Sequence, residues 1–332
     1  MKSFAGCDLT HQLHNWPIEL KKLVLLAILF SLLSACAPNI KLPGVPVTAA
    51  RITHKAIVMP DGVQLPLHTW SHSHSTEAII LALHGFNDYG TFIKNAANYF
   101  GNRSVKVYSY DQRGFGKSPH RGFWPGVDAL GRDLVTTAKL LKDRHPGIPM
   151  YLLGHSMGGA VILSALKGGN VPASEGVILV APAVWGRETM PFYQKWLLDI
   201  GARILPWLKL SGRGLGVKPS DNIEMLKSLG RDPLIIKETR IDTLWGLVNL
   251  MDTALKAAPL FDVKALILLG ENDQIINKKS SDLLLSRLPT SAALHQTKIR
   301  YEDGYHMLLR DLNSIKVWTD IMNWLRIENS DY

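Results

Sequence analysis

The chain has 332 residues, of which 46% are hydrophobic, and a formal net charge of +9. A chain of this length can bury a large core without disulfides, and its only two cysteines, Cys7 and Cys36, leave room for one at most. The positive charge is scattered and the sequence contains no nucleic-acid-binding module, so we exclude nucleic acid as a partner and expect contact with anionic lipid surfaces. A role of this charge in solubility alone is the alternative.

The first predicted element is a signal of the secretory type. Lys21 and Lys22 precede a mostly apolar run over residues 23–35, which is too short to span a bilayer comfortably but suits the apolar region of a signal peptide. The run ends in Leu-Ser-Ala-Cys, which resembles the lipobox of bacterial lipoproteins, with Cys36 as the lipidated residue. A plain signal peptide or an uncleaved anchor is the alternative.

We therefore expect residues 1–35 to be a lipoprotein-type signal peptide and residues 36–50 to hold the lipidated cysteine and a tether rich in Pro and Gly. The tether begins with Ala37 rather than an aspartate. By resemblance to lipoproteins of two-membrane bacteria, this favours anchoring in the cell envelope, at the outer membrane and facing the periplasm. Acyl chains on Cys36 would anchor the protein stably, because each buried methylene contributes about 0.8 kcal/mol.

Strand and helix patterns alternate from residue 51 onward. A hairpin is expected first, and each later strand is followed by a helical pattern. The predicted strands are residues 51–58, 63–70, 78–83, 105–110, 150–155 and 176–181, and the predicted helices are residues 91–101, 126–145 and 157–168. This order predicts the α/β class, with a mostly parallel central sheet and helices on both faces.

The alternation stops at residue 182 and resumes at residue 264. Residues 183–262 contain about four helical segments and no clear strand, which predicts a helical cap inserted into the sheet domain. The core of that domain is then formed by residues 51–182 together with residues 263–332. Two strands are expected in the second part, one from residue 264 and one over residues 293–301.

The cap has a stripe of large apolar side chains with Lys or Arg nearby. Its members include Trp196, Leu197 and Trp207. Two interpretations are open: these residues pack down on the sheet domain, or they line an acyl-chain tunnel or touch lipid.

The sequence Gly-His-Ser-Met-Gly at residues 154–158 joins a predicted strand to a predicted helix. In such a turn the serine, here Ser156, is held on a strained backbone with its hydroxyl above the sheet edge, and the glycines let strand and helix pack closely. The pattern alone arises by chance too often to be decisive. Its strand–turn–helix setting predicts a nucleophile.

An acid and a histidine follow in the order required for a catalytic triad. Asp273 and His306 each come just after a predicted strand, where functional groups of parallel sheets gather. The chain order Ser156, Asp273, His306 is that of α/β-hydrolases. The imidazole would accept the serine proton, and the carboxylate would fix its tautomer. Asp273 as a helix cap with Glu271 as the acid, and His306 as a core histidine, are the alternatives.

The oxyanion formed on attack needs hydrogen-bond donors. The backbone N–H of Met157, directly after the nucleophile, is one candidate, and the N–H of Phe86, in the turn after the predicted strand 78–83, is the other. His84 in the same turn is expected to shape it. The mechanism needs no metal and no cofactor, and we expect neither.

Five motifs are shared with a known family. They are His84-Gly85-Phe86, residues 111–118, Gly154–Gly159, Gly270–Asp273 and Gly304-Tyr305-His306. Together they resemble the α/β-hydrolases of the monoacylglycerol lipase and lysophospholipase type, over about residues 55–327. The resemblance implies the α/β-hydrolase fold, with Ser156 as nucleophile, Asp273 as acid, His306 as base and backbone donors at Phe86 and Met157.

The resemblance also implies that Arg113, in the motif at residues 111–118, is structural. The chain departs from the family in one place: monoacylglycerol lipases usually continue after His84-Gly85 with a Gly-Glu-His-like sequence, whereas residues 86–89 read Phe-Asn-Asp-Tyr. This departure leaves the hydrolase class unchanged, but it weakens the expectation that monoacylglycerol in particular is the substrate.

We therefore expect a membrane-tethered serine ester hydrolase that acts on acyl esters of lipids through an acyl-enzyme. Monoacylglycerols and lysophospholipids are the leading substrates. A peptidase or thioesterase on the same fold is one alternative, and a non-catalytic binding lipoprotein is another, although the intact triad order argues against the last. The sequence predicts no oligomeric state.

Overall fold

The computed structural model describes residues 17–24, 37–73, 75–165, 174–212, 214 and 216–330, with residues 326–330 described for their backbone only. Cys36, most of the predicted signal peptide and the end of the helix predicted to reach residue 168 lie outside the described residues. Within the described ranges, no helix combines the length and apolar character needed to cross a bilayer.

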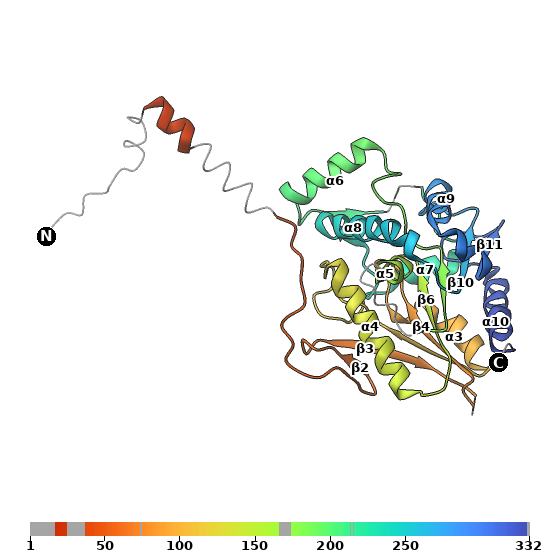
Figure 1. Cartoon of the computed structure of the whole chain (residues 1–332). Coiled ribbons are helices and arrows are strands. Elements are labelled where there is room, and N and C mark those ends of the chain that lie inside the picture. The colour runs from red at the N-terminus through yellow and green to blue at the C-terminus, as the bar shows by residue number, and fades with distance from the viewer. Residues whose placement is uncertain are drawn as a thin grey trace.

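A sheet lies at the centre of the molecule (Figure 1). Its nine strands follow the order β1-β2-β3-β5-β4-β6-β7-β10-β11. The first four strands in this order pair antiparallel, and all pairs from β5 to β11 are parallel. This confirms the predicted fold class. The strands are β1 (Arg51–Ile52), β2 (Ala56–Val58), β3 (Gln64–Trp70), β4 (Ala78–Leu83), β5 (Val105–Tyr110), β6 (Met150–His155), β7 (Gly176–Val180), β10 (Ala265–Gly270) and β11 (Gln296–Tyr301).

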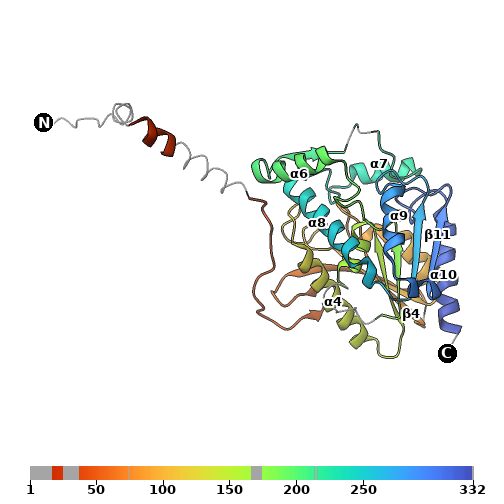
Figure 2. The ribbon, with the colours of Figure 1, turned by 45° about the horizontal axis from the view of Figure 1, so that its top comes forward.

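Helices cover both faces of the sheet because successive strand side chains point to opposite sides. In β4, for example, Ile79 and Leu81 join one buried cluster, whereas Ile80 and Ala82 join another. The first cluster also takes side chains from α4 (Val127–Arg144), α5 (Met157–Ala165), α8 (Ile241–Ala257) and α9 (Lys278–Arg287). The second takes them from η1 (Gly90–Ile93), α3 (Lys94–Gly101) and α10 (Ser314–Ser330), which lies beside β11 in Figure 2.

The inserted segment between β7 and β10 holds α6 (Phe192–Ile204), β8 (Lys209–Ser211), α7 (Ile223–Arg231), β9 (Glu238–Arg240), α8 and the short η3 (Ala258–Leu260). The expectation of no strand here was wrong, because β8 and β9 pair antiparallel. Each is only three residues long and contains one apolar residue at most, so neither has an apolar run that the sequence could reveal. In this segment α8 packs on α5 in the core, and α6 lies outside α8 (Figure 1).

The strand predicted over residues 293–301 begins too early. Residues Thr290–Leu294 form the short helix η4 after Pro289, and β11 starts only at Gln296. The apolar residues in η4 resembled the start of a strand, but only Ala292 is buried, while Leu294 is exposed. The end of β11, which positions the residues after it, lies where it was predicted.

Candidate active site

Ser156 lies in a sharp turn between β6 and α5. Its backbone has a left-handed conformation, with φ at +52°, which a non-glycine residue adopts only under strain. The Ser156 N–H donates to the carbonyl of Val180 (3.0 Å), and the Ser156 carbonyl accepts the N–H groups of Gly159 (3.0 Å) and Ala183 (2.9 Å). These hydrogen bonds hold the strained turn and leave the hydroxyl at the carboxyl edge of the sheet.

The two glycines of the motif are required by close packing. A Cβ atom on Gly158 would lie 2.3 Å from the carbonyl oxygen of Leu83 in β4. A Cβ atom on Gly154 would lie 2.5 Å from the backbone nitrogen of Gly159. Only glycine fits at either position, so the helix α5 can start directly against the sheet.

The structure brings the three predicted triad residues together. His306 Nε2 lies 2.9 Å from Ser156 Oγ, and His306 Nδ1 lies 2.8 Å from Asp273 Oδ2. The other carboxylate oxygen, Asp273 Oδ1, accepts the N–H groups of Ile275 and Ile276, each at 2.8 Å. With Nδ1–H donating to the carboxylate, Nε2 is free to accept the serine proton.

The alternatives for the acid are not supported. Glu271 lies 3.5 Å from Lys278 Nζ and 3.8 Å from an Arg300 guanidinium nitrogen, in ion pairs on the surface. The cap of α9 is Asn277, whose side chain accepts the N–H of Ser280. Asp273 is therefore the carboxylate directed at His306.

Both expected oxyanion donors flank the nucleophile. Met157 is the first residue of α5, and Phe86 follows Gly85, whose added Cβ atom would lie 3.3 Å from Ser156 Cβ. Among the backbone hydrogen bonds of the described residues, none is donated by the N–H of Phe86 or of Met157. These two groups are therefore available to an oxyanion on the substrate.

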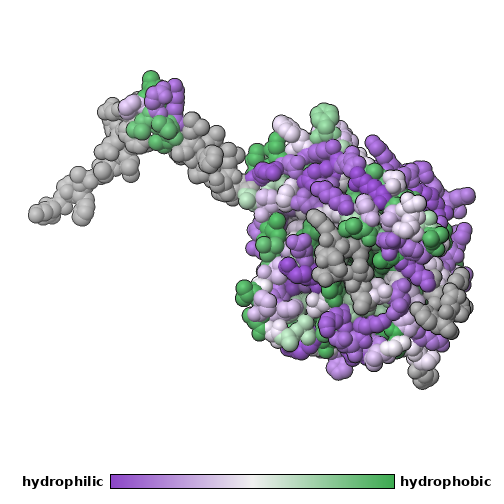
Figure 3. Space-filling view, viewed as in Figure 1, coloured by the Kyte–Doolittle hydropathy of each residue, from purple (hydrophilic) through white to green (hydrophobic). Residues whose placement is uncertain are grey.

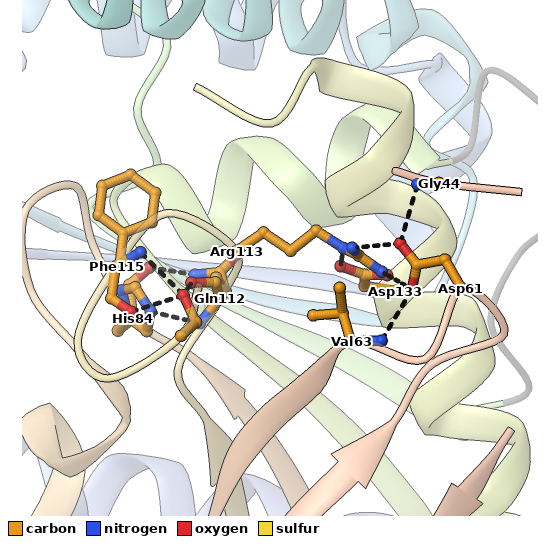
Figure 4. Close-up of polar contacts among 9 residues, drawn as sticks. Gly44, Asp61, Val63, His84, Gln112, Arg113, Phe115 and Asp133 are labelled. Atoms are coloured by element: carbon orange, nitrogen blue, oxygen red, sulfur yellow. Dashed lines mark hydrogen bonds and ion pairs between the residues drawn. The ribbon is translucent and has the colours of Figure 1, made fainter. Parts of the chain in front are cut away.

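His84, drawn with Gln112 in Figure 4, holds the turn that carries Phe86. Its Nδ1–H donates to the Gly85 carbonyl (2.8 Å), and its Nε2 accepts the N–H of Gln112 (2.9 Å). The Gln112 side chain donates in return to the His84 carbonyl (2.9 Å). Burial lowers the pKa of His84, so both nitrogens keep these fixed roles and the imidazole takes no part in proton transfer.

Arg113 is part of a separate buried network (Figure 4). Its guanidinium contacts Asp133 at 2.6 Å and Asp61 at 2.7 Å, pointing away from the turn at His84. Burial raises the pKa of Asp133 to about 6, and the charge of Asp61 adds to this, because two carboxylates share one guanidinium. The network joins the first hairpin to α4, which agrees with a structural role for Arg113.

His155, next to the nucleophile, is a positioning residue that the sequence did not reveal. Its Nε2–H donates to the backbone carbonyl of His306 (3.0 Å) and its ring stacks on Phe92. Burial, followed by the nearby His306, lowers the pKa of His155 to about 3, so it stays neutral. The partner lies 151 residues away in the chain, and no local pattern could have shown it.

The turn at residues 84–87, which carries the expected oxyanion donor Phe86 and is called the oxyanion turn below, is bonded to the inserted segment. Asn87, in a left-handed conformation with φ at +63°, donates from Nδ2 to Thr239 Oγ1 (2.7 Å), and its carbonyl accepts the N–H of Ile236 (3.1 Å). Nearby, the Tyr89 hydroxyl donates to Asp232 (2.8 Å). These contacts use the residues at which the chain departs from the lipase pattern, so the departure serves to fasten the turn to β9.

The predicted specificity residues lie on the outside of the molecule. Trp196 is 67% exposed, Leu197 is 63% exposed and Trp207 is 54% exposed. This exposure is incompatible with the first interpretation, that these side chains pack down on the sheet domain, and the second, an acyl-chain or lipid contact, stays a prediction. Hydrophobic side chains are visible at the outer edge of the molecule near α6 (Figure 3). Contact with lipid is the interpretation that agrees with their position.

Across the described parts of the chain, no cluster of three or more His, Cys, Asp or Glu side chains is arranged to hold a metal ion. The arrangement at Ser156 can carry out acyl transfer by proton transfer and oxyanion stabilisation with protein groups alone.

The family described as serine aminopeptidase, S33, matches residues 74–313. The chain is 27% identical to a monoglyceride lipase of Rattus norvegicus over 279 residues, covering 81% of this chain and 89% of that protein. It is 22% identical to a monoacylglycerol lipase of Mycolicibacterium smegmatis, covering 80% and 93%. The crystal structure of a soluble variant of Saccharomyces cerevisiae monoglyceride lipase superimposes with a TM-score of 0.69 at 20% identity, covering 88% of this chain and 98% of that one, which shows a shared fold.

Proposed function

Because this chain belongs to the serine aminopeptidase S33 family and is a serine ester hydrolase with the α/β-hydrolase fold, we propose that it hydrolyses acyl esters of lipids through an acyl-enzyme. One observation carries the proposal: an unbroken chain of hydrogen bonds runs from Ser156 Oγ through His306 to Asp273. A hydroxyl on a strained turn, with a base and an oriented acid behind it, is an activated nucleophile.

The proposed reaction has two halves. His306 Nε2 takes the proton of Ser156 as its oxygen attacks the ester carbonyl, and the N–H groups of Phe86 and Met157 stabilise the resulting oxyanion, each worth about 3–4 kcal/mol. The ester C–O bond then breaks, His306 returns the proton to the leaving alcohol, and the acyl group stays on Ser156. In the second half water takes the place of the alcohol and the fatty acid leaves.

Lipids with a single acyl chain, namely monoacylglycerols and lysophospholipids, are the proposed substrates. Several curated relatives are monoglyceride lipases, which supports the first of these classes. The exposed apolar residues of α6 and of the turn after it, including Trp196, Leu197 and Trp207, support contact with lipid. We propose that they receive the acyl chain as it leaves a lipid aggregate.

Anchoring through lipidated Cys36 belongs to the same proposal, with the outer membrane, on its periplasmic side, as the expected location. The chain enters the folded part next to the inserted segment, because the N–H of Asn39 donates to Asp242 at the start of α8 (3.1 Å). A lipid on Cys36, three residues earlier, would therefore lie close to the segment that carries the exposed apolar residues. This arrangement supports hydrolysis at a membrane surface.

The test is a panel of esters that vary in acyl length and head group, assayed with the full chain in detergent micelles and with Ser156→Ala as control. The proposal predicts turnover of long-chain monoacyl esters that the variant lacks. An aminoacyl amide and an acyl thioester in the same panel test the peptidase and thioesterase activities that the fold also supports. Preferred cleavage of either would contradict the lipid-ester assignment while keeping the nucleophile.

A further inference from the structure

A cavity of about 650 Å³ lies between the loop at residues 121–123 and the paired strands β8 and β9. It is separate from the residues of the triad, none of which lines it. The residues that line it are Arg121, Gly122, Phe123, Lys209, Ser211, Pro233, Ile235, Ile236, Lys237, Glu238 and Arg240.

The lining is strongly cationic. Four of its side chains are basic, whereas Glu238 is the one acidic residue among the described residues that form it. Arg240 is paired with Asp242 (2.6 Å). Among the described residues, the other three basic side chains form no ion pair with a carboxylate. Arg121 instead donates to the backbone carbonyl of Pro233 (2.9 Å), and Lys237 donates to that of Asp232 (2.6 Å). Both retain further N–H groups that can donate to a ligand.

Part of the lining is apolar. Phe123, Ile235 and Ile236 are its large hydrophobic residues, and the guanidinium of Arg240 lies 4.6 Å from the centre of the Phe123 ring. Such a combination suits a ligand with an anionic group attached to an apolar one. A free inorganic anion would use the basic residues alone.

The surroundings of the cavity point to a lipid bilayer as the source of this ligand. Lys209 lines the cavity, and its neighbours in sequence, Leu208 and Leu210, are exposed apolar residues that follow the exposed Trp207 in the chain. The Asp242 carboxylate that pairs with Arg240 also accepts the N–H of Asn39, where the chain coming from Cys36 joins the domain. Apolar surface, positive charge and the expected anchor are thus gathered around one pair of strands.

We propose that this cavity binds the phosphate group of an anionic phospholipid in the membrane, with the basic residues of the lining on the phosphate and its apolar residues against the glycerol and first methylenes. This site goes beyond the proposed ester hydrolysis, since its ligand is a bilayer lipid rather than the substrate. Its location at a membrane rests on that function, but the binding itself does not.

Occupancy of the cavity would bear on catalysis through the oxyanion turn. Ile236 lines the cavity, and its N–H donates to the carbonyl of Asn87, next to Phe86. Thr239, between the lining residues of β9, accepts from the Asn87 side chain. A phospholipid that fixes β9 would therefore also fix the turn that supplies an oxyanion donor, so hydrolysis would increase at an anionic surface.

The test uses the full chain with Ser156→Ala in a neutral detergent, titrated calorimetrically with dihexanoylphosphatidylglycerol. The triple variant Arg121→Gln, Lys209→Gln, Lys237→Gln is compared with a control that removes the same charge elsewhere, Lys256→Gln, Lys279→Gln, Lys298→Gln. Because the variant removes three basic groups from the cavity lining, we expect it to bind at least about tenfold more weakly and the control to bind normally.

Three results would overturn the proposal: equal weakening in both triple variants, equal binding of dihexanoylglycerol without a phosphate, or displacement by inorganic phosphate at the same concentration as the lipid. The first means general charge attraction, the second an apolar site, and the third a site for the free anion.

A second measurement follows hydrolysis of an uncharged monoacylglycerol in mixed micelles by the enzyme with Ser156 intact. Added phosphatidylglycerol should raise the kcat of the control but not that of the cavity variant. If the cavity variant loses only activity on lysophosphatidylglycerol, the cavity holds the substrate phosphate and the bilayer assignment is wrong. An enzyme inactive on all monoacylglycerols and lysophospholipids would refute the proposed function and leave the binding result standing.

Discussion

Replacing Asp273 by Asn should disable the base without unfolding the protein. One carboxylate oxygen of Asp273 accepts two backbone N–H groups, from Ile275 and Ile276, and the other faces His306 Nδ1. In the variant the amide oxygen must stay on the two N–H groups, so the amide nitrogen faces His306. Nδ1 then becomes the acceptor, and the ring proton moves to Nε2, where it points at Ser156.

A histidine with its proton on Nε2 cannot accept the serine proton. The expected loss is about 10⁴-fold in kcat, which corresponds to about 5.5 kcal/mol of transition-state stabilisation. The unfolding temperature should stay close to that of the unmutated protein, because the hydrogen bonds to Ile275 and Ile276 are kept. Steady-state hydrolysis of a soluble ester and thermal unfolding measure the two quantities.

The matched control is Glu271→Gln, which removes a carboxylate two residues away that pairs only at the surface. It should keep nearly all activity. Activity of Asp273→Asn within about tenfold of the unmutated enzyme, or a larger loss in Glu271→Gln, would refute the reasoning on the tautomer.

Three further predictions follow from packing, charge and exposure. Gly158→Ala places a methyl group 2.3 Å from the Leu83 carbonyl oxygen, so we expect a loss of about 1–3 kcal/mol in the free energy of unfolding, and unchanged stability would contradict the packing argument. The pKa of Asp133 is raised by burial from 3.8 to about 6, so the native state binds this proton more tightly and stability should fall by up to about 3 kcal/mol as pH rises through that window. Urea unfolding at several pH values should show a smaller fall in the free energy of unfolding for Asp133→Asn than for the unmutated protein. Identical pH profiles of the two proteins would contradict the raised pKa of Asp133. Alanine at Trp207 should reduce hydrolysis of long-chain esters more than of short-chain ones, whereas equal losses would exclude a lipid contact.

The parts of the site that could be predicted from the sequence are those with a local pattern. Ser156 is surrounded by glycines that its turn requires. Asp273 and His306 each follow a strand by only a few residues, because β10 ends at Gly270 and β11 at Tyr301. Since parallel strands bring their carboxyl ends to one edge of the sheet, the order of these residues was enough to predict that they meet.

The parts that could not be predicted depend on partners far apart in the chain. The pairing of β8 with β9 joins residues 209–211 to residues 238–240, and neither sequence has strand character of its own. The link from Asn87 to Thr239 spans 152 residues. The stripe containing Trp196 is equally compatible with a buried and an exposed helix face, because a hydrophobic pattern does not show what covers it.

The central claim is that Ser156 is the nucleophile that carries the acyl group. The most direct measurement treats the full chain with an alkyl fluorophosphonate, digests it and locates the added mass by peptide mass spectrometry. We expect one modified residue, Ser156, with no labelling of a folded Ser156→Ala variant and much slower labelling of His306→Ala. Modification of a different residue, or undiminished labelling of Ser156→Ala, would contradict the account.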